Sequence, residues 1–417
     1  MERIAIFHPE GNFLNNPHLS SLVELLYNSG YLTDIFSWYR EDISYQSEEL
    51  PEYIRLFLLP RHYVFFELIE RYVFIIGIDE GLIYAKNQAK YLGIKYAHIS
   101  YELLFDDEIH KYYDLFNTKR KICAAAQDIC FAILQDEKRA ELYSIEYQVP
   151  KEKIILMPVS GLNIINYNKS YYLYSLLDIP NDKYILLHFG SLEQWSMTDW
   201  LIKYSSTMPN NWVLVLHGRY GPNEYSTNFN NNVYFTKKPF KTIKEMTPLI
   251  QSAHCCCALY KSNNKSHYTN KNIKYIGLSS GKFSLSLQHG IPVLVNNNNL
   301  LGNLVMKYNS GIAIDPEKLS NLNILNNLLD IPNINESCHT LFNEKLSLSI
   351  ALPQLLDLIN KNKKNPEINK IIIKNKSQLY YKIQDLIKKI NLKYSIMLLF
   401  FLLKNIFFIL INRMKKN

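Results

Sequence analysis

The chain has 417 residues, of which 47% are hydrophobic and 20% are charged. This length allows two or three domains with well-filled cores, and the composition excludes a disordered, low-complexity or collagen-like protein. Six cysteines without a CxxC pair exclude a disulfide framework and a zinc finger. The run Cys255, Cys256 and Cys257 is predicted to be buried, because it stands in an apolar segment, and reduced thiols are typical of the cytosol.

The net charge of +8 is unevenly distributed along the chain. Residues 361–417 contain 14 Lys and Arg but only two acidic residues, whereas residues 1–360 contain 32 basic and 36 acidic residues. A mildly acidic body argues against nucleic-acid binding and places the basic chemistry in the tail.

Strands and helices alternate in the first part of the chain. The sequence opens on a strand over 3–8 without an apolar signal core, so we expect no secretory signal. Glycines mark the ends of two predicted helices, because glycine tolerates the positive φ found after a helix. The predicted elements are, in order, a loop over 9–17, a helix over 19–29 ending at Gly30, strands over 31–37 and 72–76, a helix over 80–92 ending at Gly93, a strand over 94–100, and further elements within 121–135 and 153–157.

A second alternating series follows a linker over 158–182. Its apolar runs predict strands over 184–189, 212–217, 232–235, 255–260 and 291–295. Strands that alternate with helices form parallel sheets with crossover connections. We therefore predict two Rossmann-like, doubly wound α/β domains over 1–165 and 166–360, followed by a basic tail over 361–417.

The tail combines an amphipathic and an apolar segment. Residues 379–390 place their apolar side chains on one helical face, and 394–411 are nearly all apolar apart from Lys404 and Asn405. As a helix, 394–411 spans roughly 27 Å, and Lys404 near its middle would cost about 2.5–3.5 kcal/mol in a spanning helix. Basic flanks favour a helix of residues 379–417 lying on an anionic membrane surface. The alternative is a helix packed on the protein itself or on a partner.

The most informative segment for chemistry begins at Ser279. Ser279, Ser280, Gly281 and Lys282 stand where a loop enters a helix predicted over 283–289. The backbone N–H groups and the dipole of a helix N-terminus favour an anion, and Lys282 adds a positive charge. The segment therefore predicts a cradle for a diphosphate, although it is not a Walker loop. The alternative is a Ser and Gly helix cap with a solvated lysine.

This segment is followed by Gly290, Ile291, Pro292 and Val293. An SSGK-type helix start followed by a G-I-P-V strand resembles the GT-B glycosyltransferases, specifically the large retaining family 4-like group (glycosyltransferases group 1). The stretches 4–31, 127–140 and 184–192 resemble the same family, and the resemblance covers roughly residues 1–345. It implies an N-terminal acceptor domain and a C-terminal nucleotide-sugar donor domain that face a central cleft.

One departure from the family pattern concerns two glutamates of the donor site. Many members carry them separated by seven residues, and the matching positions here are Gly277 and Leu285. Both carboxylates are missing, which puts in doubt how the ribose and the sugar hydroxyls are held.

The resemblance assigns donor-site roles to several residues of the second domain. Ser280, Gly281 and Lys282 would contact the pyrophosphate, and Gly190 and Ser191 end a strand where the family often has a Gly-Arg pair. Because that arginine is absent, Arg219 after the strand 212–217 is the substitute candidate for clamping the departing phosphate. A plain surface arginine is the alternative reading of Arg219.

In the first domain, His98 ends the strand 94–100, at the edge where α/β proteins bind ligands. The family commonly has a histidine there, close to the transferred sugar, so His98 would donate a hydrogen bond or orient the acceptor. Glu102 would act as an acceptor base or an orienting group. Gly11 and Asn12, after the first strand, would let the backbone approach the diphosphate or the acceptor. A structural histidine satisfied within the core is the alternative for His98.

The expected function is transfer of a sugar from a nucleotide-diphosphate sugar to a glycan or lipid-linked acceptor at the cytoplasmic face of the membrane. The leaving diphosphate needs stabilisation of its negative charge, and no DxD metal motif is present. Lys282, Arg219 and a helix N-terminus would supply that stabilisation, so we expect no metal and no cofactor. Retention of configuration is implied by the resemblance alone. The alternatives are a catalytically silent GT-B scaffold and a sugar-nucleotide epimerase.

Overall fold

The computed structural model describes residues 1–9, 13, 16–38, 50–59, 66–218, 231–236, 242–319, 321–364 and 369–373. The predicted site residues Gly11, Asn12 and Arg219, and the predicted tail helix over 379–417, lie outside these residues. Met1–Leu58 and Glu70–Asn369 form one compact unit, which contains both large sheets. The strands β4 (Phe66–Glu70) and β15 (Asn369–Ile373) pair with each other in a small separate sheet.

The first large sheet is built from apolar strands whose described pairs, from β2 to β8, are parallel. In this sheet Ile6 lies between Ile35 and Ile76. The chain order reverses between β1 and β5, which makes the sheet doubly wound. In spatial order its strands are β3 (Ile54–Leu59), β2 (Tyr31–Trp38), β1 (Glu2–Phe7), β5 (Tyr72–Ile78), β6 (Tyr96–Ile99), β7 (Ala132–Leu134) and β8 (Ile154–Leu156).

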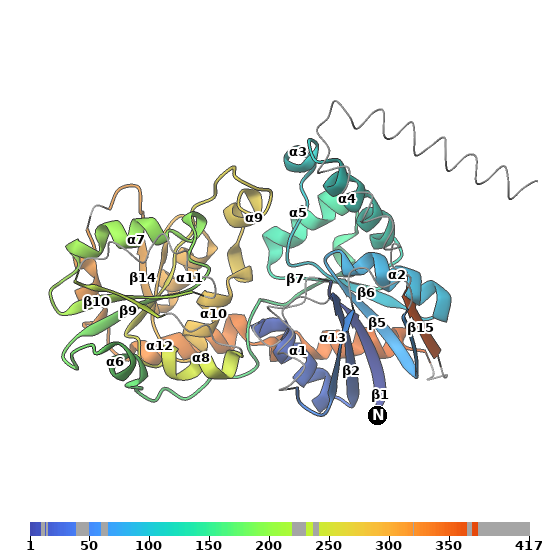
Figure 1. The fold of residues 1–417 in the computed structure, drawn as a ribbon, viewed down its shortest axis with the longest axis horizontal. Helices are drawn as coiled ribbons and strands as arrows, with labels where there is room; N and C mark the ends of the chain where they lie inside the picture. The colour runs from blue at the N-terminus through green and yellow to red at the C-terminus, as the bar shows by residue number, and fades with distance from the viewer. Residues whose placement is uncertain are drawn as a thin grey trace, which may run out of the picture. The chain divides into compact units, whose positions relative to one another are not determined.

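Helices cover both faces of the first sheet (Figure 1). Asn16 begins α1 (Pro17–Asn28), where its Oδ1 accepts hydrogen bonds from two backbone N–H groups. Leu355 and Ile359 of α13 (Leu352–Asn362) pack into the same core cluster as α1 and β1, although they come from far along the chain. The remaining helices of this half are α2 (Gly81–Leu92), α3 (Asp106–Ile109), α4 (Tyr113–Ala126) and α5 (Glu137–Tyr147).

The second large sheet is parallel throughout its described pairs. Its chain order reverses between β9 and β12, so it is doubly wound as well. In spatial order its strands are β11 (Val233–Thr236), β10 (Trp212–Gly218), β9 (Tyr184–Gly190), β12 (Cys255–Ala258), β13 (Val293–Asn296) and β14 (Gly311–Ile314).

Alternate side chains of the second sheet fill two separate cores. Cys256 belongs to one core cluster, and Cys255 and Cys257 belong to the other, on the opposite face. All three thiols are buried and free, which confirms their predicted burial. The helices of this half are α6 (Tyr172–Leu177), α7 (Thr198–Tyr204), α8 (Ile243–Ile250), α9 (Lys271–Lys274), α10 (Gly281–Gln288), α11 (Leu300–Tyr308) and α12 (Ile334–Leu341).

The predicted fold class is confirmed, because the structure contains two parallel, doubly wound α/β sheets. The glycine stops are confirmed too, since Gly30 has φ +94° and Gly93 has φ +65°. The strands β3 and β14 and the helices α5 and α13 were not predicted from the sequence. The domain boundaries at 165 and 360 stay predictions. Among the helices of the described ranges, none is long and apolar enough to cross a membrane.

Candidate functional site

The second sheet opens a cavity at its topological switch point. Here β9 ends at Gly190, next to the strand where the chain order reverses, and such points bind ligands in open α/β sheets. The cavity has a volume of about 480 Å³, and we call it the switch-point cavity. The predicted site residues that line it are Glu102, Gly190, Ser191, Ser279, Ser280, Gly281 and Lys282.

The predicted cradle coincides with the start of α10. This helix begins at Gly281, earlier than predicted, because Ser280 caps it through an Oγ that accepts from the N–H of Phe283 at 3.2 Å. The Tyr260 hydroxyl lies 2.5 Å from the same Oγ and fixes it further. The first N–H groups of a helix lack intrahelical acceptors, so this start presents donors to the cavity. Ser279 instead donates its Oγ hydrogen to Gln135 at 3.1 Å.

Lys282 is the one predicted cation of the site that the described residues include. Its side chain is buried, with 9% of the residue exposed, and its Nζ has no hydrogen-bond partner. The ammonium lies 5.1 Å from the ring centroid of Tyr260 and 5.9 Å from that of Trp195. Burial lowers the pKa of Lys282 to about 8. The alternative of a solvated lysine is therefore wrong. The unpartnered ammonium can pair with an anion that binds in the cavity.

Gly190 lies beside the Lys282 side chain. Its φ of +96° disfavours any other residue, whereas an added Cβ would meet Lys282 Cδ at an ordinary contact distance of 3.7 Å. The end of β9 and the start of α10 thus converge on one side chain.

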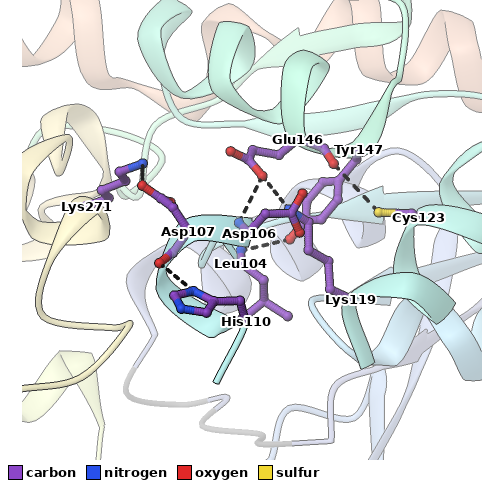
Figure 2. Close-up of polar contacts among 9 residues, drawn as sticks. All are labelled: Leu104, Asp106, Asp107, His110, Lys119, Cys123, Glu146, Tyr147 and Lys271. Atoms are coloured by element: carbon purple, nitrogen blue, oxygen red, sulfur yellow. Dashed lines mark hydrogen bonds and ion pairs between the residues drawn. The ribbon is translucent and has the colours of Figure 1, made fainter. Parts of the chain in front are cut away.

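The loop that carries Glu102 is held by hydrogen bonds at several points. The N–H groups of Tyr101 and Glu102 donate to Asp79 Oδ1 at 2.8 and 3.1 Å. Farther along the loop, the N–H of Leu104 donates to the Tyr147 hydroxyl at 3.0 Å (Figure 2). These bonds hold Glu102 at the wall of the switch-point cavity.

Ion pairs anchor the helices behind this loop. Lys119 of α4 has only 4% of its side chain exposed and pairs with Asp106 of α3 at 2.9 Å and with Glu146 of α5 (Figure 2). Lys271 of α9 pairs with Asp107 at 2.5 Å, so a residue that follows β12 reaches the helices of the first sheet. Lys119 is buried, whereas Asp106 and Asp107 are mostly exposed, so these pairs orient the helices and add little to stability.

Two buried polar residues of the cavity wall were not predicted. The amide of Asn272 exchanges two hydrogen bonds with the backbone of Leu103, both at 2.9 Å. Arg139 donates from Nε to Gln135 at 2.8 Å and from Nη1 to the Tyr275 carbonyl at 3.3 Å. Gln135 directly follows the carboxyl end of β7, and Arg139 stands four residues later in α5, one helical turn away. This spacing is the sequence signal that could have indicated Arg139.

His98 lies in a small cavity that Glu102 also lines, apart from the predicted residues of the second domain. It is 1% exposed, its Nδ1 lies 2.7 Å from the Tyr143 hydroxyl, and its Nε2 has no partner. Burial lowers its pKa to about 3, so the ring is neutral. This small cavity of about 40 Å³ shares Glu102 with the switch-point cavity, so Glu102 connects the two.

The structure gives a physical reason for one missing glutamate. Gly277 has φ +41°, and an added Cβ would lie 2.1 Å from Asp136 Oδ2. The same Oδ2 accepts the N–H of Leu278 at 2.9 Å. A carboxylate-bearing side chain at 277 would therefore collide with Asp136 in this arrangement. Leu285, at the other position, is buried at 4% exposure and lines the switch-point cavity.

Within the residues that the structure describes, no group of three or more His, Cys, Asp and Glu side chains could hold a metal ion. The expectation of a metal-independent reaction stays a prediction.

Comparison with known proteins places the fold. No protein-family model matches the chain, and no curated protein sequence matches it. Among solved structures, it is similar to Anabaena HepE in complex with UDP-glucose, with 12% identity and a TM-score of 0.64 over 87% of this chain and 100% of HepE. Sucrose-phosphate synthase from Thermosynechococcus elongatus gives 15% identity and a TM-score of 0.61 over 87% of this chain and 99% of that protein.

A third solved structure agrees with these two. WaaG, a glycosyltransferase involved in lipopolysaccharide biosynthesis, gives 13% identity and a TM-score of 0.56 over 85% of this chain and 99% of WaaG. The chain therefore has the GT-B fold, as the sequence predicted. At these identities the likeness concerns the fold alone, so activity has to be argued from the site.

Proposed function

We propose that this chain is a glycosyltransferase that moves a sugar from a nucleotide-diphosphate sugar to a glycan or lipid-linked acceptor. The observation that carries the proposal is the ammonium of Lys282, which is buried without a hydrogen-bond partner at the start of α10. An unpaired buried charge is costly, and a diphosphate in the switch-point cavity would supply the missing partner.

Each neighbouring residue has a role in this reaction. The first N–H groups of α10, at Gly281 and Lys282, would donate to the diphosphate, and Gly190 would allow the close approach of ligand and backbone. As the glycosidic bond to the leaving group breaks, negative charge grows on the diphosphate, and Lys282 stabilises it without reorganisation. Arg219 would share this role. Glu102, at the wall, would accept the proton of the attacking hydroxyl or orient it.

The structural relatives support the class of donor. HepE was solved with UDP-glucose, with UDP, and with UDP and glucose. Since the fold is shared and the switch-point cavity carries an unpaired cation, a nucleotide sugar is the donor class proposed for this chain. Retention of configuration and independence of metal belong to the same proposal.

A catalytically silent GT-B protein is the second candidate, and a specific observation favours it. Both glutamate positions of the family pattern are apolar here, and Asp136 blocks a carboxylate at 277. A silent protein would bind a nucleotide without turning over its sugar. An epimerase would change the sugar without an acceptor.

The decisive experiment is a binding and turnover assay on the full chain. Calorimetry with UDP, GDP, CDP and their sugars, with and without EDTA, is compared between wild type, Lys282→Met and Lys203→Met. Lys203 is the matched control, because it is exposed and lies 5.1 Å from the ring of Tyr204, as Lys282 does from Tyr260.

We expect one nucleotide to bind in EDTA and Lys282→Met to weaken it about 10- to 100-fold, as for a lost charged hydrogen bond, with Lys203→Met unchanged. Transfer should fall about 100- to 1000-fold in Lys282→Met. No binding of any nucleotide would contradict the proposal. Binding without turnover would favour the silent protein, and turnover without acceptor would favour the epimerase.

Residues 379–417 are proposed to dock the enzyme on the anionic cytoplasmic face of the membrane, where lipid-linked acceptors reside. Their basic and apolar residues support this part of the proposal. Deletion of 379–417 should abolish sedimentation with anionic liposomes while nucleotide binding is retained. Equal sedimentation of both forms would remove the docking role.

A further inference from the structure

A second and larger cavity lies at the carboxyl ends of β12, β13 and β14. Its volume is about 760 Å³, and we call it the second cavity. Its wall runs from Lys261 after β12, through Asn296 at the end of β13 and 298–300 after it, to 315–317 after β14. Tyr260 and Ile273 line both this cavity and the switch-point cavity, so the two adjoin.

One wall of the second cavity carries a fixed aromatic ring. Trp200 of α7 lines the cavity, and its Nε1 donates to the Pro316 carbonyl at 3.2 Å. This bond satisfies the polar atom of the indole, so the part of Trp200 that lines the second cavity is apolar. A rigid aromatic face is a surface against which the C–H groups of a sugar ring can pack.

Amide side chains occupy another part of the wall. Asn296 Oδ1 accepts the N–H of Tyr260 at 2.8 Å, and Asn299 Oδ1 accepts the N–H of Gly302 at 3.0 Å. Because each amide oxygen is fixed by a backbone group, the amide nitrogens are held as donors. Asn298, which is exposed, adds an amide with both a donor and an acceptor. Hydroxyl groups both donate and accept, so a polyhydroxyl ligand matches these side chains.

The charged side chains that line the second cavity are more often acidic than basic. Three lysines and four acidic residues belong to the described wall. Lys261 pairs with Glu317 at 3.4 Å, and Asp315 accepts the N–H of Glu317 at 3.1 Å. Asp136 accepts two backbone N–H groups, at 3.0 and 2.9 Å. All three lysines of this described wall are exposed, whereas Lys282 is buried, so the wall favours an uncharged ligand over a phosphate.

We propose that the second cavity binds a neutral sugar unit of the acceptor glycan, between Trp200 and the amides of Asn296, Asn298 and Asn299. These residues belong to the second domain, so this unit lies beyond the acceptor domain predicted over 1–165. This inference rests on the proposed function and adds the class of acceptor. The acceptor is a neutral oligosaccharide, one unit of which lies beyond the reacting sugar. The same chemistry would suit the sugar of the donor, and the test below separates the two sources.

The test uses the full chain saturated with the nucleotide that calorimetry selects. An array of neutral and acidic oligosaccharides is probed with wild type, Asn298→Arg and Asn303→Arg. Arginine at 298 adds bulk and a positive charge to the wall of the second cavity, and because Asn298 is exposed the variant is expected to fold. Asn303 is an exposed asparagine of α11 that does not line the cavity, so it is the matched control. Trp200→Leu is the second variant, with its fold checked by circular dichroism.

We expect neutral oligosaccharides to bind, with affinity at least tenfold weaker in Asn298→Arg and in Trp200→Leu, and unchanged in Asn303→Arg. Affinity for the nucleotide alone should change less than twofold in all variants. If Asn298→Arg instead weakens the nucleotide sugar relative to the nucleotide, the cavity holds the sugar of the donor and the acceptor assignment is overturned. Binding of acidic glycans only, or equal glycan binding by wild type and Asn298→Arg, also overturns it. Failure of the nucleotide to bind in the same samples identifies failure of the proposed function instead.

Discussion

The two cavities that meet at Tyr260 differ in how their charges are paired. In the switch-point cavity, the Lys282 ammonium is buried without a hydrogen-bond partner. In the second cavity, Lys261 pairs with Glu317, and Asp136 accepts two backbone N–H groups. Both cavities lie at the carboxyl ends of one parallel sheet, so the fold alone does not cause the difference. An unpaired buried charge favours a charged ligand, whereas exposed or paired charges favour an uncharged ligand that offers hydroxyl groups.

The largest effect is expected when one glycine of each cavity is replaced by alanine and the free energies of unfolding are compared. Gly277 lines the second cavity, and an added Cβ would meet Asp136 Oδ2 at 2.1 Å, at φ +41°. Gly281 lines the switch-point cavity, and an added Cβ would meet Pro17 Cγ at an ordinary 3.5 Å. We expect Gly277→Ala to lower the free energy of unfolding by about 2–4 kcal/mol and Gly281→Ala to change it by less than about 1 kcal/mol, as measured by urea unfolding.

Equal stability of the two alanine variants would contradict the contact between Asp136 and position 277. Asp136→Ala combined with Gly277→Ala sharpens the result. If the collision is the cause, the double variant should lose less stability than the sum of the two single variants.

The second prediction concerns pH and the charge of Lys282. Burial lowers its pKa from 10.5 to about 8, whereas a bound diphosphate favours the charged form. Below pH 8 the lysine is charged with or without ligand, so affinity should be constant. Above pH 8 binding must take up a proton, so affinity should fall by up to about tenfold, or 1.4 kcal/mol, per pH unit. Calorimetry in buffers of different ionisation enthalpy measures both the affinity and the proton uptake.

Lys282→Arg is the control for this titration, since arginine stays charged and its affinity should be independent of pH. His188 is neutral throughout this range, because burial and the Lys282 charge lower its pKa. The unfolded chain holds more protons than the ligand-free fold between pH 8 and 10.5, so the Lys282 contribution makes the free energy of unfolding rise with pH there. An affinity that is constant from pH 7 to 10 would mean that Lys282 either stays charged over this range or does not face the diphosphate, and the affinity of Lys282→Met separates the two cases.

The sequence predicted the parts of the site that depend on local pattern. Buried parallel strands are continuous apolar runs, so β5, β9 and β10 could be placed from the sequence. A helix start has its own signature, so Ser280 and Lys282 were found as well. Both features are set by neighbours along the chain.

What the sequence could not predict depends on contacts between distant segments. The strand β14 is short, and α13 packs on the first sheet only because the chain returns there. Asn272 matters because its amide meets the backbone of Leu103, and Trp200 because its indole meets Pro316. His98 was expected beside the transferred sugar, but its ring bonds Tyr143 at 2.7 Å, and its role at the reaction stays a prediction. None of these partners can be read from local spacing.

The smallest expected effect falls on Tyr260, one of the two residues that line both cavities. Tyr260→Phe removes a hydroxyl that lies 2.5 Å from Ser280 Oγ but keeps the ring that lines both cavities. The free energy of unfolding should fall by about 1 kcal/mol, because one buried hydrogen bond is lost. Tyr308→Phe is the control, since its hydroxyl bonds Glu344 at the surface and its loss should cost less than about 0.5 kcal/mol. Nucleotide affinity should weaken a few-fold as the Ser280 cap loosens, while binding of neutral oligosaccharides stays unchanged. If both ligands weaken equally, the two cavities act as one site, and the contrast in their charges does not separate two ligands.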